Sequence, residues 1–164
     1  MSIEIRPLGS GDGGVLSRVA EGVFDHAIEP RLAREFLADA RHHLFVAVDD
    51  GTLVGMVTAV DYVHPDKPRQ LWINEIGVAP THQRRGIARG LLDAMLAHGR
   101  AIGCTEAWLG TDQANEAANA LYRAAAGAPE PFVLYSWELE PSVTGPGPVS
   151  RPASGVEPPA GRAA

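Results

Sequence analysis

One stretch of the chain, residues 71–110, restricts the possible folds more than any other. It begins with an apolar, β-branched run at residues 71–78, continues after Pro80 with a helical pattern, and ends with a short apolar run at residues 107–110. A helix of this length between two strands of one sheet makes a right-handed crossover, which leaves the strands parallel. The stretch therefore predicts a parallel strand–helix–strand unit.

The helix in this unit is predicted to bury a broad face. Apolar side chains recur along it at helical spacing in two adjacent rows: Ile87, Leu91 and Met95, then Ala88, Leu92 and Leu96. Gly103 is expected to end the helix.

The remaining elements are predicted from shorter patterns. Residues 44–48 and 53–63 are apolar runs joined by Asp49-Asp50-Gly51-Thr52, a strong hairpin signal, so these two strands should be antiparallel. Further strands are expected at residues 3–5 and 132–139, and further helices at residues 15–24, 30–41 and 116–125. The prediction is an α/β (α+β) fold with a mixed, mostly antiparallel sheet flanked by helices.

Composition indicates one folded domain and a tail. A chain of 164 residues with 45% hydrophobic residues can close one core. Residues 141–164 are rich in Pro, Gly, Ser and Ala and contain no aromatic residue, a composition typical of disorder. We expect a catalytic domain at residues 1–140 and a disordered tail at residues 141–164.

Charge and residue types exclude several classes of function. A formal net charge of −6 disfavours binding to nucleic acid or to an anionic membrane. No stretch approaches the roughly 18 apolar residues of a membrane span, so we expect a cytoplasmic protein. Cys104 is the single cysteine, which excludes an intramolecular disulfide, and the histidines show no ligand spacing, so no metal is expected. The sequence leaves a homodimer open.

A short segment at the start of the long helix favours anion binding. It consists of Gln83, Arg84, Arg85, Gly86, Ile87 and Ala88. Backbone N–H groups at a helix start have no partner, the helix dipole adds positive potential, and the two arginines supplement it. The segment predicts a diphosphate site.

Two motifs carry a resemblance to a known family. Residues 74–92 resemble the coenzyme-binding segment of the GCN5-related N-acetyltransferases (GNAT family), in which a strand and Val-x-Pro precede Gln-x-x-Gly-x-Ala and a helix. The second family segment, Asn-x-x-Ala-x-x-Leu-Tyr, is present as Asn115, Ala118, Leu121 and Tyr122. The resemblance implies a GNAT fold and acetyl-CoA as the acetyl donor.

The resemblance also implies roles for individual residues. The backbone of Ile76, Gly77 and Val78 would hold the pantetheine arm as an added strand, and residues 83–88 would hold the diphosphate. Asn115 and Ala118 would contact the coenzyme, and Tyr122 would lie near the sulfur and donate a hydrogen bond to it. A backbone N–H in a bulge at residues 76–78 would meet the developing oxyanion.

Glu75 is the candidate general base. An alkylammonium must lose its proton before it can attack a thioester, and a carboxylate within an apolar strand is costly unless it is solvated or used. The structural alternative is a strand glutamate paired with a cation such as Arg69.

The chain looks most like the type I aminoglycoside 3-N-acetyltransferases within this family. Residues 62–69, the acid at position 75 and the acidic run before Leu121-Tyr122 carry that likeness. A polycationic small-molecule acceptor requires several carboxylates, for which the candidates are Asp25, Glu29, Glu75, Asp112 and Glu116. The predicted activity is acetylation of an aminoglycoside at the 3-amino group, with antibiotic resistance as its consequence.

Other acceptors and another class of function stay open. A GNAT enzyme could instead acetylate a protein, peptide or polyamine amine. A binding module could hold acetyl-CoA as a sensor ligand without catalysis, although a sensor needs neither Glu75 nor Tyr122. Glu116 also has a second explanation, because a carboxylate at a helix N-terminus is favoured by the helix dipole.

Overall fold

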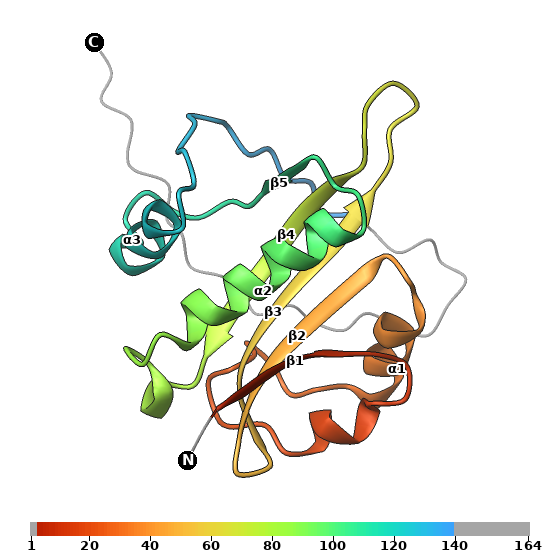
Figure 1. Ribbon diagram of the computed structural model, residues 1–164, viewed down its shortest axis with the longest axis vertical. Coiled ribbons are helices and arrows are strands. Elements are labelled where there is room, and N and C mark those ends of the chain that lie inside the picture. The colour runs from red at the N-terminus through yellow and green to blue at the C-terminus, as the bar shows by residue number, and fades with distance from the viewer. Residues whose placement is uncertain (1–2, 140–164) are drawn as a thin grey trace. The chain divides into compact units, whose positions relative to one another are not determined.

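The structure, a computed structural model, describes residues 3–139 (Figure 1). The chain divides into two compact units, residues 1–129 and residues 130–164. Every helix and strand of the described residues lies in the first unit. The tail predicted at residues 141–164 lies outside the described residues.

The first unit contains a mixed sheet of five strands in the order β1-β2-β3-β4-β5. The pairs from β1 to β4 are antiparallel, and β4 and β5 are parallel. The fold prediction is therefore confirmed, including the parallel crossover. The strands are β1 (Glu4–Leu8), β2 (His42–Asp49), β3 (Thr52–Tyr62), β4 (Gln70–Val78) and β5 (Glu106–Trp108).

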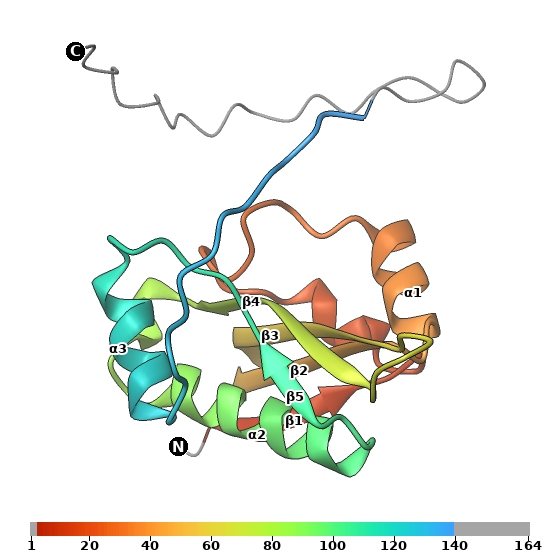
Figure 2. The same ribbon diagram turned by 90° about the horizontal axis from the view of Figure 1, so that it is seen from above.

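Helices lie on both faces of this sheet (Figure 2). The long helix α2 (Ile87–Ala101) connects β4 to β5 and packs on one face, while α1 (Pro30–Ala38) packs on the other. A 3-10 helix, Gly13–Ser17, precedes α1, and a second, Pro80–His82, precedes α2. The helix α3 (Glu116–Ala124) follows β5.

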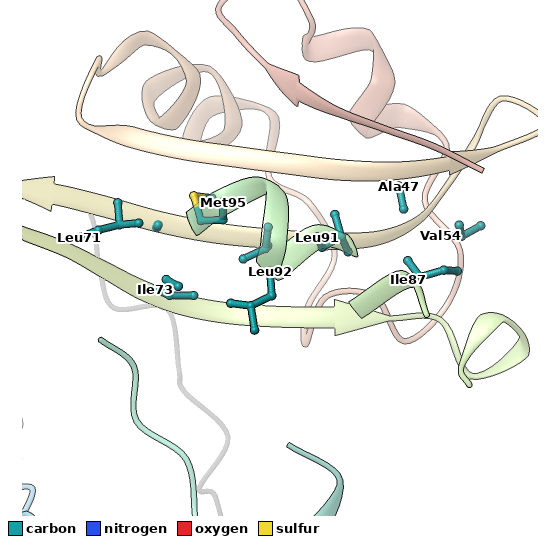
Figure 3. Close-up of a cluster of buried hydrophobic side chains, with 10 residues drawn as sticks. Ala47, Val54, Leu71, Ile73, Ile87, Leu91, Leu92 and Met95 are labelled. Atoms are coloured by element: carbon teal, nitrogen blue, oxygen red, sulfur yellow. The ribbon is translucent and has the colours of Figure 1, made fainter. Parts of the chain in front are cut away.

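Each face of the sheet has its own apolar cluster. The cluster under α2 is shown in Figure 3 and includes Ala47, Val54, Leu71, Ile73, Ile87, Leu91, Leu92 and Met95. Both rows predicted on α2 contribute to it, which explains why this helix forms. The cluster on the opposite face gathers Leu8, Leu16, Val23, Leu44, Val46, Leu53, Met56 and Ala79.

The turn between β2 and β3 is formed by two residues with positive φ. Asp50 has φ 46° and Gly51 has φ 71°. Two consecutive positive φ values match the right-handed twist of the flanking strands, and Asp-Gly accepts them at little cost. The hairpin prediction is confirmed.

A buried polar network joins β2, β3 and α2. Asp61 is only 3% exposed, and its carboxylate lies 2.8 Å from His43 Nε2 and 3.2 Å from Arg69 Nη1. His98 Nε2 lies 3.0 Å from His43 Nδ1. Partial burial lowers the pKa of His98, and the neighbouring His43 lowers it further. The carboxylate of Asp61 is thus satisfied by His43 and Arg69, and His98 contacts His43 from α2.

Two predicted elements are wrong. Residues 15–24 form no α-helix beyond the 3-10 turn, because the chain at this point hydrogen-bonds to β3: Ala20 N–H donates to Leu53 O, and Leu53 N–H donates to Arg18 O. Gly22 then has φ 76°, which a helix cannot contain. Residues 132–139 form no strand in the structure, since an apolar pattern favours a strand but cannot supply the partner that a ladder requires.

Candidate active site

A bulge in β4 determines which way Glu75 points. Thr58 of β3 pairs with Glu75, but the next residue, Ala59, pairs with Ile73, so Asn74 is an extra residue in β4. Side chains alternate between faces along a strand, and one extra residue shifts that alternation. Ile73 therefore packs under α2, whereas Glu75 lies on the face of Thr58, away from α2.

The surroundings of Glu75 shift its proton affinity. The residue as a whole is exposed, yet nearby protein atoms remove part of the water from its carboxyl group. This desolvation raises the pKa of Glu75 above its ordinary value of 4.5, and the negative charge of Asp25 raises it further. A carboxylate with a raised pKa is a better proton acceptor near neutral pH.

Arg69 does not support the structural alternative for Glu75. The guanidinium of Arg69 pairs with Asp61 instead. No ion pair joins Glu75 to a cation among the described residues 3–139.

The loop at residues 18–29 forms the wall beside Glu75. A side chain at Gly77 would place its Cβ 2.1 Å from the backbone oxygen of Val23, so only glycine lets this loop approach β4 so closely. Asp25 follows two residues later and acts electrostatically on Glu75. Residues 19–22 and 24–28 of the loop also line a hollow of about 300 Å³.

One edge of β4 is left open beside this wall. Pairing with β5 covers only residues 70–72 of β4. Within the described part of the chain, residues 73–78 have no strand partner on that side, so the backbone of Ile76, Gly77 and Val78 is available there for an extended ligand. A ligand with amide groups, such as pantetheine, fits an open strand edge.

The start of α2 lies directly after this edge. Gly86 has φ 79°, and a Cβ added to it would meet no atom within 4 Å, so the backbone turns sharply and leaves free space above it. Arg84 also has a positive φ, 63°, and Arg84 and Arg85 are exposed. The side chain of Gln83 donates to Val78 O at 3.3 Å, which ties the loop to the end of β4. Exposed cations and the N–H groups of the first helical turn, at Ile87 and Ala88, fit a diphosphate.

The helix α3 carries the second family motif. The side chain of Asn115 caps the helix by accepting from Ala118 N–H at 3.1 Å, so its oxygen is engaged within the protein. Tyr122 is half-buried and packs against the cluster under α2, as do Ile76 and Val78. Burial raises the pKa of Tyr122. Its phenol therefore keeps its proton at neutral pH and can donate a hydrogen bond.

The predicted acceptor carboxylates do not all gather. Asp25 and Glu75 are close enough to interact. Glu29 is not on a helical face with Asp25, because residues 18–29 form a loop; it precedes α1 and pairs with Arg31 at 3.4 Å. Asp112 is exposed after β5, and Glu116 is exposed in the first turn of α3.

Some features of this region are not predicted by the sequence analysis. The bulge at Asn74 lies two residues before the expected position at residues 76–78, because its place depends on the β3 register. Asn119 donates from its side chain to the backbone oxygens of Asp112 and Asn115 and so fixes the loop before α3. An asparagine four residues after a helix cap is the only local signal for that contact.

Solved structures of similar fold include three acetyltransferases. An aminoglycoside acetyltransferase from an uncultured soil metagenomic sample, in complex with sisomicin, superposes with TM-score 0.74 and 20% identity over 84% of this chain and 97% of that chain. The aminoglycoside N-acetyltransferase AAC(6')-Iy, in complex with CoA, gives 0.66 and 23% over 84% and 95%. A ribosomal-protein-alanine N-acetyltransferase from Brucella melitensis biovar Abortus 2308 gives 0.66 and 22% over 84% and 100%. At these low sequence identities, the structural likeness establishes the fold alone.

The family is shown by the sequence itself. No curated protein matches the chain. The profile of the acetyltransferase (GNAT) family, whose enzymes use acetyl-CoA, matches residues 16–128, which include the bulged strand, the start of α2 and α3. The chain therefore belongs to the GNAT family of acetyltransferases.

Proposed function

We propose that this chain acetylates an amino group of an aminoglycoside, with the 3-amino group as the first candidate. The observation that carries the proposal is the position of Glu75. The Asn74 bulge turns this carboxylate to the face away from α2, beside Asp25 and next to the open edge of β4. A candidate base and an open edge for an extended donor thus lie on one strand, and the loop beside it carries a second carboxylate.

The charges beside Glu75 suit a cationic acceptor. The negative charge of Asp25 raises the pKa of Glu75, and an ammonium group bound beside both carboxylates would offset this repulsion. Asp112 and Glu116 are exposed and can serve further ammonium groups. Two of the structural neighbours are described as aminoglycoside acetyltransferases, which supports the same class of acceptor.

The donor side of the site fits acetyl-CoA. Its pantetheine arm would lie along Ile76, Gly77 and Val78, and its diphosphate would lie against residues 83–88. Ala118 would face the coenzyme from α3, and Asn115 would use its amide nitrogen, since its oxygen caps the helix. Acetyl-CoA supplies the acetyl group as a thioester, whose C–S bond breaks as the C–N bond to the amine forms.

Two side chains on opposite faces of β4 serve the reaction, one at the amine and one at the leaving sulfur. Glu75 accepts a proton from the acceptor ammonium, directly or through water, which leaves the amine nitrogen with its lone pair. The Tyr122 phenol, kept protonated by burial, donates a hydrogen bond toward the leaving sulfur. A backbone N–H at the bulged part of β4 would meet the oxyanion.

Acetylation would remove one positive charge from the antibiotic, and a drug so altered would lose ionic contacts with its target. We propose resistance as the biological outcome and the cytoplasm, where acetyl-CoA is made, as the location. No metal is assigned a part in this reaction.

The test measures thiol release from acetyl-CoA. Purified protein is mixed with acetyl-CoA and gentamicin-type or kanamycin-type aminoglycosides, with spermidine and an N-terminal alanine peptide as controls. Rapid release with an aminoglycoside, reduced about 10²- to 10⁴-fold in Glu75→Gln, is the expected result. NMR of the product then identifies the acetylated position, and sedimentation of the same sample distinguishes monomer from homodimer.

Other outcomes are equally specific. Release only with the peptide or spermidine would overturn the antibiotic acceptor and leave the acetyltransferase. Tight acetyl-CoA binding without release for any amine would favour a sensor. Acetylation at a 6'-amine would replace the 3-amino assignment and keep the acceptor class.

A further inference from the structure

A shallow, open aromatic hollow lies on the same face of the sheet as Glu75. It is lined by Val60, Tyr62, His64, Trp72 and Trp108 and has a volume of about 520 Å³. We call these five residues the aromatic notch. All five come from β3, the loop after it, β4 and β5.

The strand register places the notch in line with Glu75. Trp72 pairs with Val60, and Glu75 pairs with Thr58. Thr58, Val60 and Tyr62 alternate along β3 and so point to one face. Trp72 and Glu75 therefore share that face of β4, separated by about 10 Å at the rise of an extended strand.

The notch also marks the point where two strands part. Trp72 and Trp108 are the last pair of the β4–β5 ladder. Beyond them β4 continues alone to Glu75 along its open edge. A ligand at Glu75 that extends back along β4 reaches the notch first.

The aromatic rings of the notch are arranged edge to face. Those of Trp72 and Trp108 are nearly perpendicular, at 82°, with centroids 4.0 Å apart. Tyr62 stands at 73° to Trp108, with centroids 6.5 Å apart. Perpendicular indoles present a face and an edge at once, and aromatic faces attract the partly positive C–H groups of a sugar as well as ammonium groups.

Polar groups hold these rings and border them. Trp108 Nε1–H donates to the Tyr62 hydroxyl at 2.9 Å, and this hydroxyl donates to Gln70 Oε1 at 3.0 Å. The Gln70 amide in turn donates to Glu106. Trp108 is nevertheless 45% exposed. The notch is thus pre-organised, accessible and bordered by a carboxylate.

We infer that the aromatic notch binds a second ring of the acceptor, an amino-sugar or aminocyclitol ring next to the one that carries the reacting amine. The ring packs its C–H face on Trp108 and Trp72, and its ammonium lies toward Glu106. The spacing of about 10 Å from Glu75 corresponds to one ring beyond the reacting ring. This inference rests on the proposed function, whose acceptor it specifies further.

The test compares a one-ring acceptor with a two-ring acceptor. The probes are 2-deoxystreptamine and neamine, used with the wild-type chain and with Trp108→Leu and Trp108→Phe. In Trp108→Leu the KM for neamine should rise about tenfold, while kcat and the KM for 2-deoxystreptamine change less than about twofold. Trp108→Phe, which keeps an aromatic face, should restore the KM for neamine to within about threefold.

Val63→Ala is the matched control. Val63 is 67% exposed and lies between two notch residues in sequence, but it does not line the notch. It should leave both KM values unchanged. Thermal unfolding verifies that each variant is folded. If Trp108→Leu does not fold, Trp108→Phe still tests the role of the ring at this position.

Two results would overturn the inference. One is an equal rise of KM for both acceptors in Trp108→Leu; the other is an unchanged KM for neamine. If the wild-type chain acetylates no amine, the proposed function fails, and neamine binding is measured by tryptophan fluorescence. Quenching that persists in Trp108→Phe and is lost in Trp108→Leu would then still support the notch, and absence of quenching would reject it.

Discussion

Under α2 the sheet buries Leu71, Leu91 and Met95 completely, whereas on the opposite face of β4 Trp72 is only partly covered and Glu75 is exposed. Both faces belong to the same strands. The helix α2, of 15 residues, covers the first face. On the second face, α1 and the loop at residues 18–29 cover β1, β2 and β3, but part of β4 stays accessible. Along β4, the face under α2 is thus closed by apolar packing, whereas Glu75 and Trp72, which we assign to proton transfer and acceptor binding, lie on the accessible face.

The largest expected effect tests the closed face. Leu91→Ala removes a fully buried side chain from the cluster under α2 and should lower the free energy of unfolding by about 3 kcal/mol, measured in urea. KM for both substrates should stay unchanged where the variant is folded. Leu32→Ala, at a position 49% exposed on α1, is the control and should cost less than about 0.5 kcal/mol. An altered acceptor KM in Leu91→Ala would contradict the separation of the faces.

Gly77→Ala tests the junction of β4 with the loop wall. The added Cβ would meet the Val23 backbone oxygen, so the loop must move, at a cost of about 2 kcal/mol. Displacement of Asp25 should also raise the KM for the acceptor. Gly55→Ala is the comparison on the closed face, where the two nearest atoms belong to the side chains of Ile87 and Leu91, at 3.1 and 3.2 Å. It should leave the acceptor KM unchanged.

Gly86→Ala tests the start of α2. A non-glycine residue at φ 79° costs about 1 kcal/mol, and the altered turn should raise the KM for acetyl-CoA but not for the acceptor. Gly103→Ala, with φ 86° and equally free space after the other end of α2, is a matched control. It should cost the same stability with no effect on either KM. Equal kinetic effects of the two variants would remove the donor role from this turn.

The smallest expected effect concerns Glu75 and pH. Because the pKa of Glu75 is raised in the folded protein, folding favours its neutral form, and the stability that this contributes is lost as pH rises through the folded pKa. Glu75→Gln should therefore melt slightly higher than wild type at pH 7.5, and the gap should close below about pH 4.

The pH profile of activity tests the same group. For the wild-type chain, kcat/KM should fall as pH is lowered through the raised pKa of Glu75. A profile that stays flat down to pH 4.5 would reject Glu75 as the base.

Local pattern was enough to predict the elements that form the closed face. The rows on α2 and the Asp50-Gly51 turn depend on residues near in sequence, and both predictions are confirmed. The helix predicted at residues 15–24 failed because this segment bonds to β3. Hydrogen bonds to β3, which is distant in sequence, therefore determine the structure of this segment.

The candidate site depends even more on contacts between residues that are distant in sequence. Its coenzyme motifs were recognisable in sequence, but the direction of Glu75 depends on the Asn74 bulge, which exists only in the register with β3. Arg69, the cation expected to pair with Glu75 in the structural alternative, pairs instead with Asp61. The aromatic notch likewise arises only where β3, β4 and β5 meet, from residues 60–64, 72 and 108.

The network around Asp61 has a consequence for how the chain avoids misfolded alternatives. A slip of β2 against β3 by one residue would turn His43 to the other face and leave the Asp61 carboxylate without that partner in an apolar interior. A buried charge with a missing partner costs several kcal/mol, far more than a displaced methyl group. The apolar side chains of these strands tolerate a shifted neighbour, but the acid at the end of the hairpin does not. Asp61 thus favours the native register of β2 and β3 over the register shifted by one residue.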